Sequence, residues 1–222
     1  GVTGVQTCAL PISHQRYGAN LLVNAFVSGR TAALLADEAG IGKTRTAQAA
    51  ARTIADAKAK ERGEEYGKVI VLTEGNELIN ASLGGLKSQL ASANIPRNRV
   101  YFHTYDAYSK DLIPDIESAD VIVFDEAHNL KNTSAVRNQM SKATKAFKIF
   151  VTATPADKLA GVMYFLPDIL GKAPNTVANM LAMSKDKAQT VANAVESAAT
   201  VGAYVRRVSE TQKPIADRKS TR

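Results

Sequence analysis

The chain has 222 residues, of which 45% are hydrophobic, and it carries 28 Lys and Arg against 21 Asp and Glu. This length suits one large domain or two small ones, can bury roughly 70% of the unfolded surface, and with this apolar content excludes wholesale disorder. No apolar stretch approaches the ~20 residues that a membrane span needs, and the net charge of +7 is compatible with a polyanionic partner without establishing one.

The two ends of the chain differ from its middle. Residues 1–13 lack the basic start and the sustained apolar core of a signal peptide, and they resemble the translation of a short-read sequencing adapter, as residues 217–222 do when read from the opposite strand. We expect residues 1–13 and 214–222 to be disordered and not native, and the genuine segment to cover about residues 13–216 of a longer gene. The alternative is a pair of disordered native termini.

This interpretation affects two properties of the chain. The single cysteine, Cys8, would not be biological, and a tail with three basic residues and one acid would lower the net charge from +7 to +5 when removed. A lone cysteine forms no internal disulfide, which fits a cytoplasmic protein.

The middle of the chain alternates between helical and strand patterns. Helices are predicted over residues 15–27, 43–59, 77–92, 105–117 and 133–146, and strands over residues 32–36, 69–73, 100–103, 121–125 and 148–152. The strands are nearly continuous apolar runs, which is typical of a parallel sheet with helices on both faces. We therefore expect an α/β domain over residues 14–170, with ligands bound outside the carboxyl ends of the strands.

Residues 175–205 are rich in Ala and Val and follow a different pattern. Apolar side chains recur there at helical spacing, at Val177, Leu181, Ala188, Val191, Val195 and Ala198. This spacing predicts one or two amphipathic helices. Because many of the residues are small, we expect the helical extension over residues 171–213 to pack on the domain rather than to form a coiled coil.

A phosphate-binding loop is predicted between the first strand and the next helix. Its sequence is Asp37-Glu38-Ala39-Gly40-Ile41-Gly42-Lys43-Thr44. In such loops the backbone N–H groups surround phosphate oxygens, the lysine neutralises the β- and γ-phosphates and the hydroxyl binds Mg²⁺. The general pattern has glycine where this chain has Asp37, so the segment by itself also fits a turn that caps a helix.

Two adjacent carboxylates follow a second apolar strand. Residues 121–124 lead directly into Asp125-Glu126-Ala127-His128. Acids at the end of a buried strand are costly unless a cation is near, and Asp125 can hold Mg²⁺ while Glu126 polarises the water that attacks a γ-phosphate. The alternatives are a helix N-cap for Asp125 and an ordinary surface imidazole for His128.

Together with Thr152-Ala153-Thr154-Pro155, these two segments resemble the first RecA-like domain of superfamily-two helicases and translocases. Within that group, residues 37–44 and 125–132 are most similar to the Swi/Snf-type ATPases, whose loop has an aspartate in the place of Asp37, and the region around Tyr164 resembles the strawberry-notch branch. The resemblance covers residues 15–166 and resumes at Val205-Arg206-Arg207, which is similar to the segment that leads to a second motor domain.

This resemblance implies ATP and Mg²⁺ as cofactors and an active site of a few residues. Residues 37–44 would bind ATP, with Lys43, Asp125 and Glu126 catalytic and Thr44 and Asp125 holding the metal. Gln15, which lies 28 residues before Lys43, would read the adenine edge. The alternative for this glutamine is a polar residue on an exposed helix face.

The resemblance also implies a nucleic-acid partner, with double-stranded DNA expected. His128, Thr152 and Thr154 would couple the nucleotide state to nucleic-acid contact. Residues 73–75 and 104–105 would face the nucleic-acid backbone, and ordinary turn positions are the alternative for them. The basic residues that could contact phosphates, or could simply be solvated, are Lys87, Arg97, Arg99 and Lys131.

The chain contains no Gln-x-x-Gly-Arg-x-x-Arg segment, which in this family carries the arginines of the second RecA-like domain. Since an arginine supplied in trans contributes about 10³–10⁵ in rate, we expect weak ATP binding and slow hydrolysis. The leading hypothesis is an ATP-driven motor domain for DNA, bacterial or phage-encoded. The alternatives are the motor part of a restriction or phage defence system, and a nucleotide-gated module that binds nucleic acid without turnover.

Overall fold

Six parallel strands form one sheet in the order β3-β2-β4-β5-β1-β6 in a computed structural model. The model describes residues 13–37, 42–80, 99–130, 133–153, 159–200, 202 and 204–205. The strands are β1 (Ala32–Leu35), β2 (Val69–Thr73), β3 (Val100–Thr104), β4 (Val121–Phe124), β5 (Phe147–Val151) and β6 (Tyr204–Val205). The predicted α/β class with a parallel sheet is confirmed.

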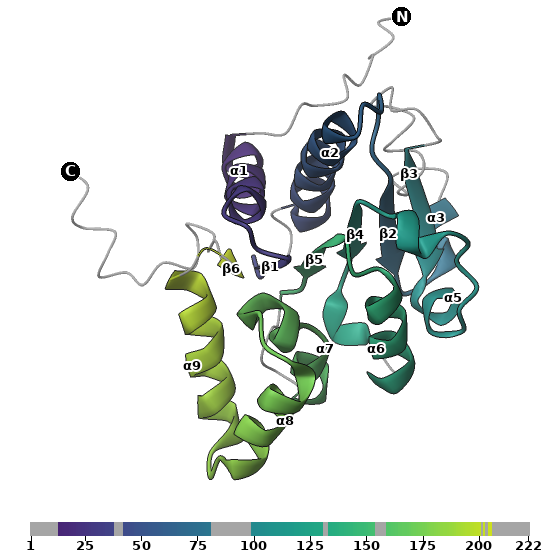
Figure 1. The fold of residues 1–222 in the computed structure, drawn as a ribbon. Helices are drawn as coiled ribbons and strands as arrows, with labels where there is room; N and C mark the ends of the chain where they lie inside the picture. Colours follow the sequence, from purple (N-terminus) through teal and green to yellow (C-terminus); the bar gives the residue numbers. More distant parts are fainter. Residues whose placement is uncertain are drawn as a thin grey trace, which may run out of the picture.

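Helices cover both faces of this sheet (Figure 1). Alternate side chains such as Leu35, Val71 and Val123 pack against α1 (Ser13–Val27) and α2 (Lys43–Glu61). Their neighbours, such as Leu34 and Phe124, belong to the core on the opposite face, beneath the later helices. Those helices are α5 (Tyr105–Ser109), α6 (Thr133–Lys142), α7 (Leu159–Leu170), α8 (Pro174–Met183) and α9 (Lys187–Thr200). Burial on both faces explains why the strands are apolar throughout.

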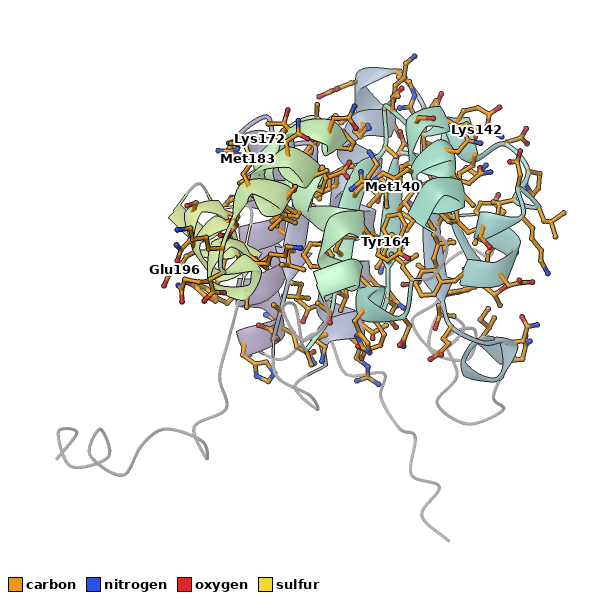
Figure 2. The ribbon with its side chains drawn as sticks, turned by 90° about the horizontal axis from the view of Figure 1, so that it is seen from below. Met140, Lys142, Tyr164, Lys172, Met183 and Glu196 are labelled. Carbon is orange, nitrogen blue, oxygen red and sulfur yellow. The ribbon has the colours of Figure 1, made fainter. Side chains whose placement is uncertain are left out.

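The helical extension packs on the domain, as expected, rather than presenting an apolar face for a coiled coil. Val177, Leu181, Val191 and Val195 are buried in the same core as Phe165 of α7. Figure 2 looks onto this layer: Met140 and Tyr164 lie between α6 and α7, whereas Met183 and Glu196 lie at the outer surface of α8 and α9.

Apart from shifts of one or two residues at the ends of elements, four predicted features differ from the structure. The helix predicted over residues 133–146 ends at Lys142. Ala188, expected on the buried stripe, is exposed, and Ala194 is buried instead. The helix predicted through residue 205 ends at Thr200, and Tyr204–Val205 form β6, because this segment meets the free edge of β1. The helix predicted over residues 105–117 is broken into α5 and the short 3-10 helix η1 (Ile116–Ser118).

The break in residues 105–117 has a local cause. Asp111 and Asp115 adopt left-handed backbone conformations, with φ of 59° and 53°, and Pro114 between them cannot continue a helix. The remaining described elements are α3 (Asn76–Asn80), within the predicted helix over residues 77–92, and the 3-10 helix η2 (Ala127–Asn129). Residues 81–98 lie outside the described part of the chain.

A buried carboxylate closes the amino end of the sheet. Asp120, 3% exposed, precedes β4 and accepts hydrogen bonds from Arg62 Nη1 at 2.7 Å and from the backbone N–H of Lys68 at 2.9 Å. Arg62 directly follows α2, and Lys68 directly precedes β2. One side chain therefore joins the starts of two strands to the end of a helix, away from the edge at which ligands are expected.

Close packing of α2 on the sheet requires small residues. Ala47, Ala50, Ala51 and Ala55 of this helix are fully buried, and a Cβ added at Gly67 would lie 2.1 Å from the carbonyl oxygen of Ala55. Among the described residues, no helix has the length and apolar character needed to cross a membrane.

Candidate functional site

The site begins at the first turn of α2. Gly42, which precedes this helix, has φ 81° and ψ 38°, a conformation that glycine adopts at little cost. Gly42 has no side chain with which to cap α2, and the first turn of this helix contains no acidic residue. A helix N-terminus of this kind attracts anions through its N–H groups and its dipole. Lys43, 7% exposed, stands at the same end.

Part of the predicted ATP-binding loop lies outside the described residues. Asp37 is fully buried just beyond β1. Four of the eight predicted residues, Glu38, Ala39, Gly40 and Ile41, lie outside the described part of the chain. The structure therefore places the two ends of the loop, and the binding roles of its middle stay predictions.

Thr44 and Asp125 meet although 81 residues separate them. The Thr44 hydroxyl lies 3.0 Å from Oδ1 and 3.2 Å from Oδ2 of Asp125, to which it donates. The contact forms because β1 and β4 are parallel and both end at the same edge of the sheet. Asp125 leaves β4 with its backbone N–H bonded to the Leu72 carbonyl of β2 at 2.9 Å.

The environment of Asp125 is suited to a cation. The residue is 7% exposed, and burial raises the pKa of its carboxyl to about 6, against the smaller effects of the Thr44 hydrogen bond and the Lys43 charge, which lower it. An ionised carboxylate is therefore costly there until a positive charge arrives. A hydroxyl and a carboxylate supply hard oxygen ligands of the kind that Mg²⁺ prefers, so these two residues fit that ion.

Glu126 follows in a strained backbone conformation. Its φ of 51° and ψ of 54° are left-handed, which costs a residue other than glycine roughly 1–3 kcal/mol. The turn sends consecutive carboxylates into different surroundings. The side chain of Glu126 is 43% exposed, so it remains accessible to water while Asp125 is buried.

His128 joins the Asp125–Glu126 segment to the end of β5. Its Nδ1 lies 3.1 Å from the hydroxyl of Thr152 and 3.4 Å from Oε2 of Glu126. Thr152 is fully buried, and its backbone N–H donates to the Leu35 carbonyl of β1 at 3.0 Å. Two of the three predicted coupling residues are thus in contact, whereas Thr154 lies outside the described residues. The coupling role itself stays a prediction.

Gln15 lies against Gly42 rather than on an exposed helix face. The residue is 7% exposed, and its Nε2 is 2.1 Å from the place that a Cβ of Gly42 would occupy. The alternative of an exposed polar position is therefore wrong. The structure adds a contact that the sequence did not indicate, and adenine recognition by Gln15 stays a prediction.

Three residues for which nucleic-acid contact was one of two expectations make contacts within the domain. Tyr105, expected either to face nucleic acid or to be an ordinary turn residue, is 8% exposed and donates its hydroxyl to the Asp125 carbonyl oxygen. Thr104 accepts from the Ala107 N–H and so caps α5. Arg99 precedes β3 and so lies at the amino ends of the strands, whereas Asp125 lies at their carboxyl ends. The Arg99 guanidinium pairs there with the Asp56 carboxylate at 2.5 Å. Lys87, Arg97 and Lys131 fall outside the described residues.

The sequence did not predict the contact between Tyr105 and Asp125, because no local sequence pattern indicates it. A second unpredicted contact joins Asn129 Nδ2 to Glu74 Oε2 at 3.0 Å. It links η2 to the turn after β2, one of the segments expected to face nucleic acid. Both contacts depend on the order of the strands, which the sequence alone does not state.

Comparison with known proteins decides the family. The family described as type III restriction enzyme, res subunit, matches residues 10–157, more than half of the chain and all of the predicted site residues. The chain belongs to this family. Within it, the fold and the motifs are those of the first RecA-like domain of a superfamily-two helicase. No curated protein matches the chain at a significant level.

Two solved structures have a fold similar to that of this member of the res-subunit family. The SWI2/SNF2 ATPase core of Sulfolobus solfataricus in complex with dsDNA is 17% identical, with a TM-score of 0.60, over 93% of this chain and 46% of that chain. The SWI2/SNF2 ATPase core domain of the same organism is 18% identical, with a TM-score of 0.60, over 93% and 45%. The chain therefore spans less than half the length of these structures.

Proposed function

We propose that the chain binds ATP with Mg²⁺ and hydrolyses it as part of a motor that acts on DNA. The observation that carries this proposal is the contact between Thr44, at the start of α2, and Asp125, after β4. A hydroxyl, a buried carboxylate and a lysine beside a helix N-terminus form an arrangement that suits a metal-bound polyphosphate better than any other ligand class.

Each residue has a separate task in this proposal. Thr44 and Asp125 would hold Mg²⁺, which neutralises phosphate charge when it is bound. Lys43 would neutralise the terminal phosphates, and the N–H groups at the start of α2 would bind their oxygens. Glu126, more exposed than Asp125, would orient a water molecule and accept its proton.

Double-stranded DNA is the proposed track. Two facts support it: the net charge, which stays positive at +5 when the tail of residues 217–222 is left out, and a solved structure of similar fold that is in complex with dsDNA. Because the chain spans less than half of that structure's length, we propose that a second RecA-like domain supplies the missing arginines. The chain alone would then hydrolyse ATP slowly.

The motor part of a restriction or phage defence system is a second candidate. The description of the matching family, type III restriction enzyme, res subunit, favours it. It shares the ATP site with the first proposal and differs in the attached domains. A nucleotide-gated module without turnover is less favoured, because Lys43, Asp125 and Glu126 are all present.

Titration of a fluorescent ATP analogue tests the nucleotide site. We expect binding that requires Mg²⁺ and falls at least tenfold in Lys43→Ala, while Lys60→Ala, an exposed lysine near the other end of the same helix, binds like the wild type. Equal binding in EDTA, or in Lys43→Ala, would contradict the proposal.

A Glu126→Gln variant separates a motor from a passive binder. In a motor, this variant should retain ATP and hold duplex DNA more tightly than the wild type does in the presence of ATP. In a passive module, the substitution should change neither nucleotide retention nor DNA binding.

A further inference from the structure

The backbone of the Asp125–Glu126 turn is held from two sides. The N–H of Asp125 donates to the Leu72 carbonyl of β2 at 2.9 Å. Its carbonyl oxygen accepts the hydroxyl of Tyr105, the first residue of α5. The N–H and the carbonyl oxygen of Asp125 therefore each have a hydrogen-bond partner, and the two partners lie on different segments of the chain.

The Tyr105 hydrogen bond acts on the peptide plane that leads into Glu126. The carbonyl of Asp125 and the N–H of Glu126 belong to one planar group, so a partner that fixes the carbonyl also fixes the direction in which Glu126 begins. Glu126 has a left-handed φ of 51°, and its side chain makes no capping hydrogen bond to η2. Such a conformation persists only when its surroundings impose it.

Tyr105 is itself rigidly placed. It is 8% exposed and packs in the core beneath the sheet. The preceding residue, Thr104, ends β3 and caps α5 by accepting the N–H of Ala107 at 3.2 Å. The Tyr105 hydroxyl therefore belongs to a residue at the junction between a strand and a capped helix.

We propose that Tyr105 is a positioning residue, which holds the Asp125–Glu126 peptide so that the Glu126 carboxylate faces the reacting water. The proposal rests on the proposed ATP hydrolysis and adds a residue that the sequence placed at the nucleic-acid surface. Tyr105 touches neither nucleotide nor metal in this role. It acts through the backbone of its neighbour, while the carboxylate of Asp125 keeps its own contact with Thr44.

The chain contains a matched control on the same helix. Tyr108 is 1% exposed, and its hydroxyl has no hydrogen-bond partner among the residues that the structure describes. Tyr105→Phe and Tyr108→Phe therefore make the same chemical change three residues apart, and both keep an aromatic ring in the core. Only the first removes a hydrogen bond to the Asp125 carbonyl.

Hydrogen exchange of the unliganded chain is the first measurement. We expect peptides that cover residues 121–130 to exchange at least fivefold faster in Tyr105→Phe than in the wild type, and to be unchanged in Tyr108→Phe. Unchanged exchange of this segment in Tyr105→Phe would overturn the proposal. Thermal unfolding of both variants, followed by circular dichroism, checks that each is folded.

Single-turnover hydrolysis, with the chain in excess over ATP, is the second measurement. Tyr105→Phe should lower the hydrolysis rate at least fivefold and leave the Kd for ATP·Mg²⁺ within twofold, because Lys43, Thr44 and the Asp125 carboxylate are unaltered. An unchanged rate, or a Kd that weakens as much as the rate falls, would overturn the positioning role. If the wild type binds no ATP·Mg²⁺, the proposed function fails, and hydrogen exchange alone then decides whether Tyr105 holds the turn.

Discussion

Replacement of Asp125 by asparagine should stabilise the nucleotide-free chain. Burial raises the pKa of this carboxyl from 3.8 to about 6. The folded state then binds a proton more tightly than the unfolded state, so the stability associated with this group is lost as the pH rises through about 4 to 6. Above that window the ionised carboxylate costs roughly 3 kcal/mol. Asparagine retains the acceptor for Thr44 and carries no charge.

Urea unfolding at two pH values measures this effect. From the pKa values above, Asp125→Asn should gain roughly 2 kcal/mol in free energy of unfolding at pH 5 and roughly 3 kcal/mol at pH 7.5. The buffer should contain EDTA and no nucleotide, because a bound cation would remove the cost. The gain over the wild type should thus grow by roughly 1 kcal/mol between the two conditions.

Asp106→Asn is the matched control. The side chain of Asp106 is 68% exposed, in an ion pair with Lys110 on the surface, so its replacement should leave the free energy of unfolding nearly unchanged at both pH values. If Asp125→Asn is less stable than the wild type, or if its gain does not depend on pH, then burial of an unpaired charge is the wrong account of this residue. The same variant should lose Mg²⁺-dependent nucleotide binding, which is the usual conflict between stability and function.

Three further outcomes are expected. Thr44→Val should weaken nucleotide binding in Mg²⁺ at least tenfold and leave binding in EDTA unchanged, whereas Thr53→Val, exposed on the same helix, should bind like the wild type in the same titration. Gly67→Ala should unfold at lower urea than Gly75→Ala, because a Cβ at Gly67 would lie 2.1 Å from the backbone carbonyl oxygen of Ala55 whereas a Cβ at Gly75 would meet nothing within 4 Å; equal losses would refute the clash. Asp120→Ala should cost roughly 2 kcal/mol or more in urea unfolding, because it leaves the Lys68 N–H without its partner; a smaller loss would mean that water replaces the carboxylate.

The proposed chemistry of the site rests on short runs of sequence. Lys43-Thr44 after one apolar strand and Asp125-Glu126 after another indicated a metal-bound phosphate site, because such residues at strand ends have few structural uses. The same apolar runs indicated a sheet buried on both faces, since a strand exposed on one face would alternate with polar residues. Both inferences use residues that lie close together in the sequence.

Contacts between distant segments depended on tertiary structure. The order of the strands places Tyr105 beneath Asp125 and pairs Tyr204–Val205 with β1, and hydrophobic periodicity carries no information on that order. Tyr105 and Tyr108 have the same local character in the sequence, yet only one finds a buried acceptor. The left-handed position of this turn is occupied by Glu126 and not by glycine, so the sequence does not indicate the turn. Its conformation comes from the partners around it, because local preference alone would oppose it.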